Sequence, residues 1–413
     1  MLTGTNLVYT KQYNLRIVHE VIRLLGPISR ADIARHTELT GQTISNLVKE
    51  LLSLGLVVEA ERRREGRGAP STALAINPDG AYSIGLDFNR EHLTGVLVDL
   101  AGNVRQRAYV ELDLPTPARA LDLMADMVET LIASQGLPRS DVWGVGIGIP
   151  GPMYHAEHGK GYVVNPTAFP GWHNIPLASW LHERLGLPVF LENNATAAAV
   201  GEHWYGAGQQ ITTFFYLFFG SGLGGGLVMN GLPYEGSTGN AGEIGYFPST
   251  MAGDSNGADS HVGLLFNLPH LYETLRNGGA DAETPADLDR LFAEGHPALL
   301  DWVEQAAAHL TGLVLAVEYL IDPEAIIFGG RLTDGVLRGL MDRVARQLPA
   351  RRIGGKVTAP RLLLATAGVD SAALGVATLP IYAFFAPAPH VLLKLPKGPP
   401  TSGLAMPRTV AAG

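Results

Sequence analysis

Apolar residues recur every three or four positions through most of residues 1–55, which is the spacing of amphipathic helices. Gly26-Pro27 and Gly55 interrupt this pattern, and Ser29 lies three residues before Asp32, a spacing typical of a helix cap. The predicted elements are helices at Lys11–Leu25, Arg30–His36 and Thr40–Leu54, then strands at Leu56–Glu59 and Thr72–Ile76. Three helices followed by a two-stranded wing predict a winged helix-turn-helix domain over residues 1–76.

The third predicted helix has an outward face of polar side chains, and the turn of the wing is rich in arginine. Amides and hydroxyls near a helix start can reach base edges, while a later lysine and arginines on a wing suit phosphates or a minor groove. A solvated surface is the alternative for the helix alone, and the basic wing favours binding of double-stranded DNA. The candidate DNA-binding residues are Gln42, Thr43, Ser45, Asn46, Lys49, Arg62, Arg63, Arg64 and Arg67.

A turn cluster at Asn77–Gly80 separates this domain from a longer region of alternating strands and helices. Its first half reads strand, strand, strand, helix, strand, at Tyr82–Phe88, His92–Asp99, Val104–Leu112, Ala118–Gln135 and Val142–Ile149. Its second half repeats this plan, with a third strand beginning at Tyr234, and its other predicted elements are Phe214–Phe219, Gly225–Met229, Leu271–Leu275, Pro285–Glu294, Ala298–Leu320, Ala325–Phe328, Val336–Gln347, Leu362–Thr366 and Ser371–Phe385.

This order of elements resembles the half-domain of the ribonuclease-H-like, actin-like superfamily of sugar kinases and chaperone ATPases, in which two halves close around a cleft. We therefore expect an α/β protein in which an N-terminal winged helix-turn-helix precedes a two-lobed sugar-kinase ATPase fold over residues 77–385. Lobe one would comprise about 80–195 plus 371–385, and lobe two about 196–370. Residues 386–413 contain six prolines and little periodicity, which predicts a disordered tail.

The net charge of −9 is unevenly distributed along the chain. Residues 1–76 hold ten Lys/Arg and seven Asp/Glu, a balance of +3, which leaves 20 and 32, a balance of −12, for the rest. A basic head on an acidic body indicates that only the head meets a polyanion. With no cysteine, no basic and apolar leader and no uninterrupted apolar run of membrane-spanning length, we expect a cytoplasmic protein without a membrane partner.

Several motifs, in the same order, resemble the ROK family (repressors, open reading frames, kinases). They are Gly148–Pro152, Asn165-Pro166 with Gly171-Trp172, Glu192–Ala195, the glycine cluster 220–226, Ala241–Gly245 and Ile327–Gly330. The match spans about residues 11–380, and with the winged head it is similar to the repressor branch that includes regulators of xylose, glucose and N-acetylglucosamine use. The resemblance implies a monosaccharide effector, a homodimer or homotetramer, and carbohydrate uptake or catabolism genes as targets.

Two departures from the family kinases indicate a pocket that binds a sugar without phosphorylating it. Those kinases carry Asn-Asp-Ala where this chain has Asn193-Asn194-Ala195, and their aspartate takes the proton of the sugar hydroxyl. Asn194 has no titratable acceptor near neutral pH, and a positioned base contributes roughly 10²–10⁴-fold in rate. The kinases also use an Asp-x-Gly-Gly-Thr turn for ATP phosphates, which Asp87-Phe88-Asn89-Arg90 does not match. We expect no catalytic residue and no cofactor, although the cluster 220–226 could cradle a phosphate or form a tight hairpin.

A third departure concerns metal. Many family members follow the glutamate motif with a histidine and a zinc-binding cysteine cluster, whereas this chain has Tyr246 at the histidine position and no cysteine. His155 and His158 have metal-like spacing, but unpartnered histidines in a polar turn are more often solvated. Between Pro248 and Val262 the only other candidate ligands are Asp254, Asp259 and His261, so no metal site is predicted.

The polar groups that remain for a sugar are amides, one carboxylate, one phenol and a backbone position. They are Asn165, Asn193, Asn194, Glu243, Tyr246 and Gly151. Amides and carboxylates suit vicinal hydroxyls, and Tyr246 or Trp172 could stack on a sugar face, with a core anchor as the alternative for Trp172.

These patterns favour a sugar-responsive DNA-binding regulator, most simply a repressor, over two alternatives. One is an ATP-dependent sugar kinase with an incidental head, which requires a base that the motifs do not supply. The other is a constitutive DNA-binding protein whose body serves only for oligomerisation, which predicts no sugar binding.

Overall fold

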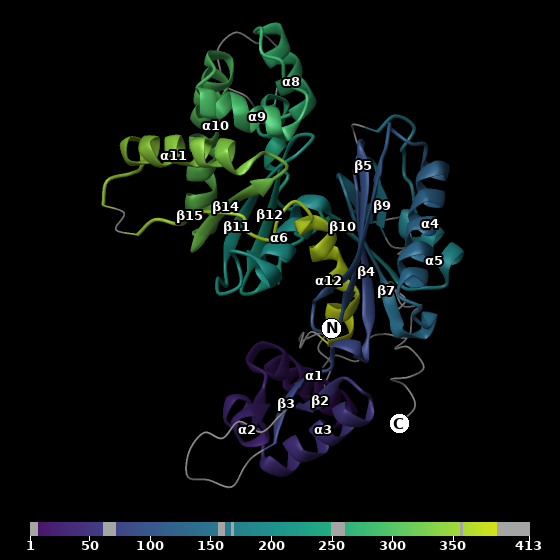
Figure 1. Cartoon of the computed structure of the whole chain (residues 1–413). Helices are drawn as coiled ribbons and strands as arrows, with labels where there is room; N and C mark the ends of the chain where they lie inside the picture. The colour runs from purple at the N-terminus through teal and green to yellow at the C-terminus, as the bar shows by residue number, and fades with distance from the viewer. Residues whose placement is uncertain are drawn as a thin grey trace.

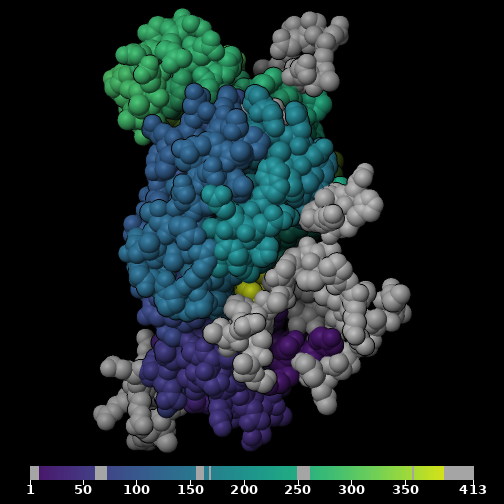
Figure 2. Space-filling model, turned by 90° about the vertical axis from the view of Figure 1, so that its right-hand side faces the viewer, coloured from purple at the N-terminus to yellow at the C-terminus, as the bar shows by residue number. Residues whose placement is uncertain are grey.

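A computed structural model describes residues 7–60, 72–155, 162–166, 169–248, 261–355 and 358–385. A helical head lies at one end of the molecule, and two α/β lobes, each built on a five-stranded sheet, lie beyond it (Figure 1). Figure 2 shows the same order from the side, with the head below, lobe one in the middle and helices of lobe two at the top. Among the described residues no helix is long and apolar enough to span a bilayer.

The head combines three helices with a three-stranded sheet of order β1-β3-β2. Its elements are α1 (Leu7–Leu25), β1 (Ile28–Ser29), α2 (Arg30–Thr37), α3 (Gly41–Ser53), β2 (Val57–Ala60) and β3 (Ala73–Ile76). The predicted helices and wing strands are confirmed within a few residues, whereas two-residue β1 is too short to show periodicity. Helix caps explain the sharp starts of α2 and α3: the Ser29 hydroxyl accepts from Asp32 N and the Thr40 hydroxyl from Thr43 N, each at 3.2 Å.

Lobe one contains a sheet of order β10-β7-β4-β5-β6, in which β4, β5 and β6 form the predicted antiparallel meander and β7 and β10 run parallel to β4. Helices α4 and α5 cover one face of this sheet, and α12 packs on the other (Figure 1). The elements are β4 (Tyr82–Phe88), β5 (His92–Asp99), β6 (Val104–Glu111), α4 (Pro117–Ser134), β7 (Val142–Ile149), β8 (Met153–His155), β9 (Tyr162–Val164), α5 (Leu177–Leu185) and β10 (Val189–Asn193). Strand β10 and helix α5 are not predicted, because short apolar runs do not distinguish strand from helix.

Lobe two contains a sheet of order β13-β12-β11-β14-β15, flanked by helices α8 to α11. Its elements are β11 (Phe214–Phe219), β12 (Leu223–Met229), β13 (Leu232–Pro233), α7 (Val262–Leu265), α8 (Leu268–Asn277), α9 (Pro285–Glu294), α10 (Pro297–Ile321), β14 (Ala325–Gly330), α11 (Asp334–Arg351) and β15 (Arg361–Leu364). The prediction of a strand beginning at Tyr234 is wrong, since β13 ends at Pro233. The positive φ angles of Asn230 and Gly231 turn the chain earlier than the sequence pattern indicates.

Helices α6 (Asn194–Tyr205) and α12 (Ser371–Phe385) form a central helix pair between the two sheets. Two glycines set their separation: a Cβ on Gly375 would lie 1.7 Å from Ala197 O, and one on Gly201 would lie 2.1 Å from Ser371 O. The two backbones are therefore in direct contact, and the pair can move only as one body unless the helices separate.

The head is seated on the ends of this helix pair. The His19 ring of α1 stacks on Phe385 of α12 at 4.0 Å between centroids, and the Arg23 guanidinium lies 4.0 Å from the centre of the Trp204 ring of α6. Apolar residues of α1 belong to the same buried cluster as Trp143 and the last turns of α12. The first helix of the head thus packs against both central helices, and the head is not connected to the lobes by a linker alone.

Candidate functional site

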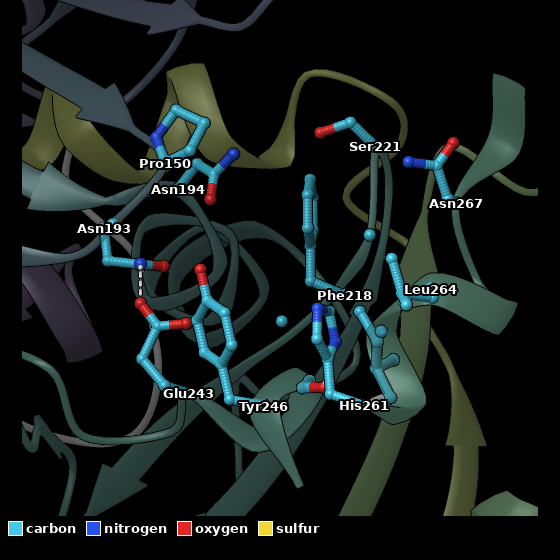
Figure 3. A pocket seen from close by; sticks show the side chains of 16 residues that line it. Pro150, Asn193, Asn194, Phe218, Ser221, Glu243, Tyr246, His261, Leu264 and Asn267 are labelled. Atoms are coloured by element: carbon cyan, nitrogen blue, oxygen red, sulfur yellow. Dashed lines mark hydrogen bonds between the residues drawn. The ribbon is translucent and has the colours of Figure 1, made fainter. Parts of the chain in front are cut away.

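A cleft of about 260 Å³ lies where the ends of β7 and β10 face the glycine-rich turn of lobe two (Figure 3). Five of the six predicted sugar-binding residues line it, namely Gly151, Asn193, Asn194, Glu243 and Tyr246. Groups from positions 151 to 246 therefore meet in one place. The remaining lining residues are Pro150, Phe218, Ser221, Gly222, Leu223, Gly224, Gly245, His261, Gly263, Leu264 and Asn267.

Asn193 links the start of α6 to the carboxyl group of the cleft. Its Oδ1 accepts from Ala195 N at 2.8 Å and so caps α6, while its Nδ2 donates to Glu243 Oε1 at 3.1 Å (Figure 3). Gly151 makes room for this contact, because a Cβ there would lie 2.3 Å from Glu243 Oε1. The backbone at 151 and the carboxyl at 243 thus approach more closely than any other residue type would allow.

Asn194 stands at the first position of α6, with its amide connected to the β4–β5 turn. Its Nδ2 donates to Asn89 Oδ1 at 3.1 Å, and Asn89 Nδ2 donates to Asp87 Oδ1 at 3.0 Å. The other oxygen of Asp87 lies 3.1 Å from His92 Nε2, which is also 3.1 Å from Arg331 Nη1 of lobe two. Side chains therefore fill the turn in which the family kinases have glycines.

Burial changes the acid–base properties of two carboxyl groups here. It raises the pKa of Glu243 to about 7. Burial, with the Glu235 carboxylate second, raises the pKa of Glu192 to about 8, although Glu192 Oε1 accepts from Asn193 N at 2.7 Å. Near neutral pH both groups are therefore partly protonated, unlike ordinary surface glutamates.

The far wall of the cleft is aromatic and apolar. Tyr246 is 46% exposed, and its ring centroid lies 5.2 Å from that of His261, whose Nδ1 is 3.0 Å from Gly245 O. Phe218, His261, Leu264, Ser221 and Asn267 are lining residues that sequence reasoning did not select. The sequence singled out His261 only as a candidate metal ligand and Ser221 only as part of the glycine cluster 220–226. Asn267 precedes Leu-Pro, which is a helix-cap pattern, and its Oδ1 accepts from His270 N at 3.1 Å.

Asn165 and Trp172 lie outside the lining of the cleft. Asn165 Nδ2 donates to Asn174 Oδ1 at 3.0 Å and its Oδ1 accepts from Asn174 N, so its amide is engaged within its own loop. Trp172 is fully buried against Phe88 and Phe169, and its Nε1 donates to Pro115 O at 3.0 Å. Of its two interpretations the structure supports the core anchor.

The glycine cluster forms the hairpin between β11 and β12 and only partly borders the cleft. A Cβ on Gly226 would lie 2.5 Å from Ala195 O, and one on Gly224 would lie 2.9 Å from Ala195 Cβ. These glycines are therefore needed for α6 to pack on β12. Gly222, in contrast, lines the cleft, and a Cβ there would meet only Gly263 O, at 3.9 Å.

Metal ions in proteins are mostly held by His, Cys, Asp and Glu side chains. Within the described ranges no three His, Cys, Asp or Glu side chains gather closely enough to hold an ion. His158, Asp254 and Asp259 lie outside those ranges. The zinc cluster of the family cannot form in this chain, because it contains no cysteine and has Tyr246 in place of the histidine.

The predicted DNA-binding face of α3 is exposed on the side opposite its buried apolar residues. Gln42, Ser45, Asn46 and Lys49 are exposed and Thr43 is half-buried, whereas Ile44, Leu47, Val48 and Leu51 are buried. Gln42 Nε2 donates to Asn46 Oδ1 at 3.3 Å, so these two amides form one surface. The predicted wing arginines Arg62, Arg63, Arg64 and Arg67 lie outside the described residues.

Known proteins are similar to both the head and the lobes of this chain. The xylose repressor of Bacillus spizizenii is 30% identical over 62% of this chain and 64% of its own length. The xylose repressor of Caldicellulosiruptor bescii is 27% identical over 78% of this chain and 84% of its own length. A family model described as MarR family matches residues 12–68, which contain the helices of the head.

Solved structures share the fold. A ROK family transcriptional regulator, a homolog of the E. coli Mlc protein, superposes with a TM-score of 0.74 at 22% identity, over 91% of this chain and 98% of its own. The ROK hexokinase of Thermus thermophilus superposes with a TM-score of 0.56 at 28% identity, over 72% of this chain and 96% of its own. A model described as ROK family matches residues 83–382, well over half of the sequence. This protein is therefore a member of the ROK family with a winged helix-turn-helix head.

Proposed function

We propose that this protein is a sugar-responsive transcriptional regulator, a repressor of carbohydrate uptake or catabolism genes, whose cleft binds a monosaccharide without phosphorylating it. The observation that carries the proposal is the position of Asn194: it lines the cleft where a kinase needs a base, and it begins a helix whose other end contacts the head. The xylose repressors among its relatives make D-xylose the first effector to test.

The cleft has recognition groups, and at the reacting position it carries an amide, Asn194, instead of a base. The Asn194 amide can hydrogen-bond a hydroxyl and cannot remove its proton, whereas a base contributes roughly 10²–10⁴-fold in rate. Glu243 has a raised pKa, but one of its oxygens already accepts from Asn193. This arrangement favours binding over transfer.

Sugar binding in the cleft would act on DNA binding by the head. Exposed Gln42, Ser45 and Asn46 on α3 suit base edges, Lys49 suits a phosphate, and the wing arginines are proposed to add phosphate or minor-groove contacts. A two-fold operator would require a homodimer or a homotetramer, which places one α3 on each half-site. Operator binding also implies a cytoplasmic location.

The central helix pair offers a route from cleft to head. A sugar bound at Asn193 and Asn194 touches the first turn of α6, and Trp204 in its last turn contacts Arg23 of α1. A sugar that favours one position of the lobes shifts the pair, and hence the spacing of two heads in an oligomer, only through its different affinity for the two states.

A gel-shift assay on the protein's own promoter region tests the proposal. We expect a shifted complex at low salt that D-xylose, or another monosaccharide from a panel with D-glucose and N-acetylglucosamine, dissociates. Absence of a complex at low salt, with or without sugars, would overturn the regulatory function. A complex that no sugar affects, together with no heat in calorimetric titration, would indicate the constitutive DNA-binding alternative.

An ATP-dependent sugar kinase is the second candidate, and two observations favour it. The fold matches a ROK hexokinase, and a second cavity of about 340 Å³ lies at the end of β14, beside Gly329, Gly330 and Arg331. ADP release with ATP and each sugar of the panel measures this activity directly. Wild-type turnover above the rate without enzyme would overturn the non-catalytic proposal.

A further inference from the structure

We infer that Asn89 is a positioning residue for the cleft: it holds the Asn194 amide so that the Asn194 oxygen faces the ligand. The inference rests on the proposed function, because it concerns how the same cleft recognises a sugar. It starts from the amide chain, defined as Asp87, Asn89 and Asn194, whose two hydrogen bonds measure 3.0 and 3.1 Å. All three side chains are at least nine-tenths buried, with exposures of 3%, 6% and 8%.

The chemistry of Asp87 gives the amide chain a direction. The Asp87 oxygen at 3.0 Å is a hydrogen-bond acceptor, and Asn89 presents its NH₂ to it. Asn89 then presents its oxygen to Asn194, and Asn194 must donate its own NH₂ in return. Turning either amide over would place two oxygens, or two NH₂ groups, against each other in a buried site.

The Asn194 oxygen is consequently the group left for the ligand. Figure 3 shows it directed into the pocket, while the nitrogen points away. The neighbouring Asn193 amide offers less, because its Oδ1 caps α6 and its Nδ2 already donates to Glu243. When Glu243 is ionised, the side chains at this end of the cleft present mainly acceptors, Asn194 Oδ1 and the second oxygen of Glu243. These match a ligand that donates from adjacent hydroxyls.

The amide chain also changes what Asn194→Asp would do. An aspartate at 194 has no N–H for Asn89 Oδ1, so the substitution would place a carboxylate against that oxygen. Asn89 would have to turn over, and its NH₂ would then leave Asp87. Installing the kinase aspartate therefore breaks the chain that orients the site, and Asn194→Asp alone is not expected to produce a kinase.

Calorimetric titration of the full-length protein with D-xylose, D-glucose and N-acetylglucosamine tests the inference. For a sugar that the wild type binds, we expect Asn89→Ala to raise Kd about tenfold, because an unrestrained Asn194 amide loses its oriented acceptor. Asp87→Ala, which removes the oxygen that accepts from Asn89 Nδ2, should weaken binding in the same way. Arg90→Ala, in the same turn but outside the amide chain, should leave Kd unchanged.

A double-mutant cycle separates positioning from a structural role. If Asn89 acts through Asn194, then adding Asn89→Ala to Asn194→Ala should not weaken binding further. Full additivity, or an Asn89→Ala variant that binds like the wild type, would overturn the inference and leave the proposed function standing. No heat from any sugar with folded wild-type protein would overturn both. If Asn89→Ala does not fold, Asp87→Ala with Asn194→Ala provides the same cycle.

Discussion

At the scale of single residues, two carboxyl groups with raised pKa values set the pH response of the cleft. Glu243 lines the cleft, and one of its oxygens accepts a hydrogen bond from Asn193 Nδ2. Glu192 lies on β10, and one of its oxygens accepts a hydrogen bond from a backbone N–H. Since only Glu243 lines the cleft, ligand binding should follow Glu243 and folding stability should follow Glu192.

We predict that sugar affinity rises with pH around Glu243. Its pKa of about 7 means that the carboxylate, the better acceptor for a hydroxyl, becomes the main form between pH 6 and pH 8. If only the carboxylate binds, Kd should fall by up to about tenfold over that range. Glu243→Gln should bind more weakly and flatten the profile. Titration calorimetry at pH 6, 7 and 8 measures this, and a flat wild-type profile would contradict it.

Glu192 should make the folded protein less stable as pH rises. Its folded pKa of about 8 lies above the ordinary value of 4.5, so between these two values the folded state holds a proton that the unfolded state has released. The stabilisation is therefore complete below about pH 4.5 and is lost as pH rises through about 8. Glu192→Gln, which keeps an acceptor for Asn193 N, should reduce the fall in Tm between pH 6 and pH 8. An unchanged fall would contradict this role.

At the scale of elements, the contact between α6 and α12 depends on glycines that a helix would otherwise disfavour. Inside a helix, glycine lowers the stability by about 1 kcal/mol relative to alanine. The presence of Gly201 and Gly375 is therefore explained by packing and not by helix propensity. The sequence shows them as isolated glycines within helical patterns. Their reason becomes visible only in the distances from each to the backbone of the other helix.

We predict that Gly375→Ala destabilises the protein by about 1–3 kcal/mol or more, because its Cβ would lie 1.7 Å from Ala197 O. Gly312→Ala is the matched control: it lies within α10, and a Cβ there meets nothing within 4 Å. The control should be neutral or stabilising by up to about 1 kcal/mol. Urea denaturation of the two variants measures the difference, and equal stabilities would show that the helices can separate without cost.

At the scale of the whole molecule, the seat of the head on α6 and α12 should transmit the state of the cleft. We predict that Trp204→Ala leaves sugar and operator affinities close to wild type and reduces the effect of sugar on operator binding by roughly fivefold or more. Trp204→Phe keeps a ring beneath Arg23 and should retain most of the response. Fluorescence anisotropy of labelled operator, titrated with sugar, measures the coupling. A full response in Trp204→Ala would place the coupling elsewhere.

Much of this architecture follows from local patterns. Periodicity, caps and turn residues predict the head helices, the meander of lobe one and the hairpin of lobe two, because these elements depend on residues close in sequence. The same reasoning misses β10 and α5 and misplaces the strand at Tyr234. Of the predicted sugar-binding residues, Asn165 lies outside the cleft, while Phe218 and Leu264 lie within it without a sequence signal.

The sequence by itself determined the residue types at the site. These are an amide at 194, a turn without glycine directly after Asp87, and the absence of the cysteines that a zinc site would need. These are matters of composition and order, which need no coordinates. Only the tertiary structure decided that Asp87 and Asn89 join Asn194 across 105 positions, and that α6 runs from the cleft to the head. Hydrogen-bond direction and helix-to-helix contact depend on which groups meet in space, and a linear pattern does not specify that.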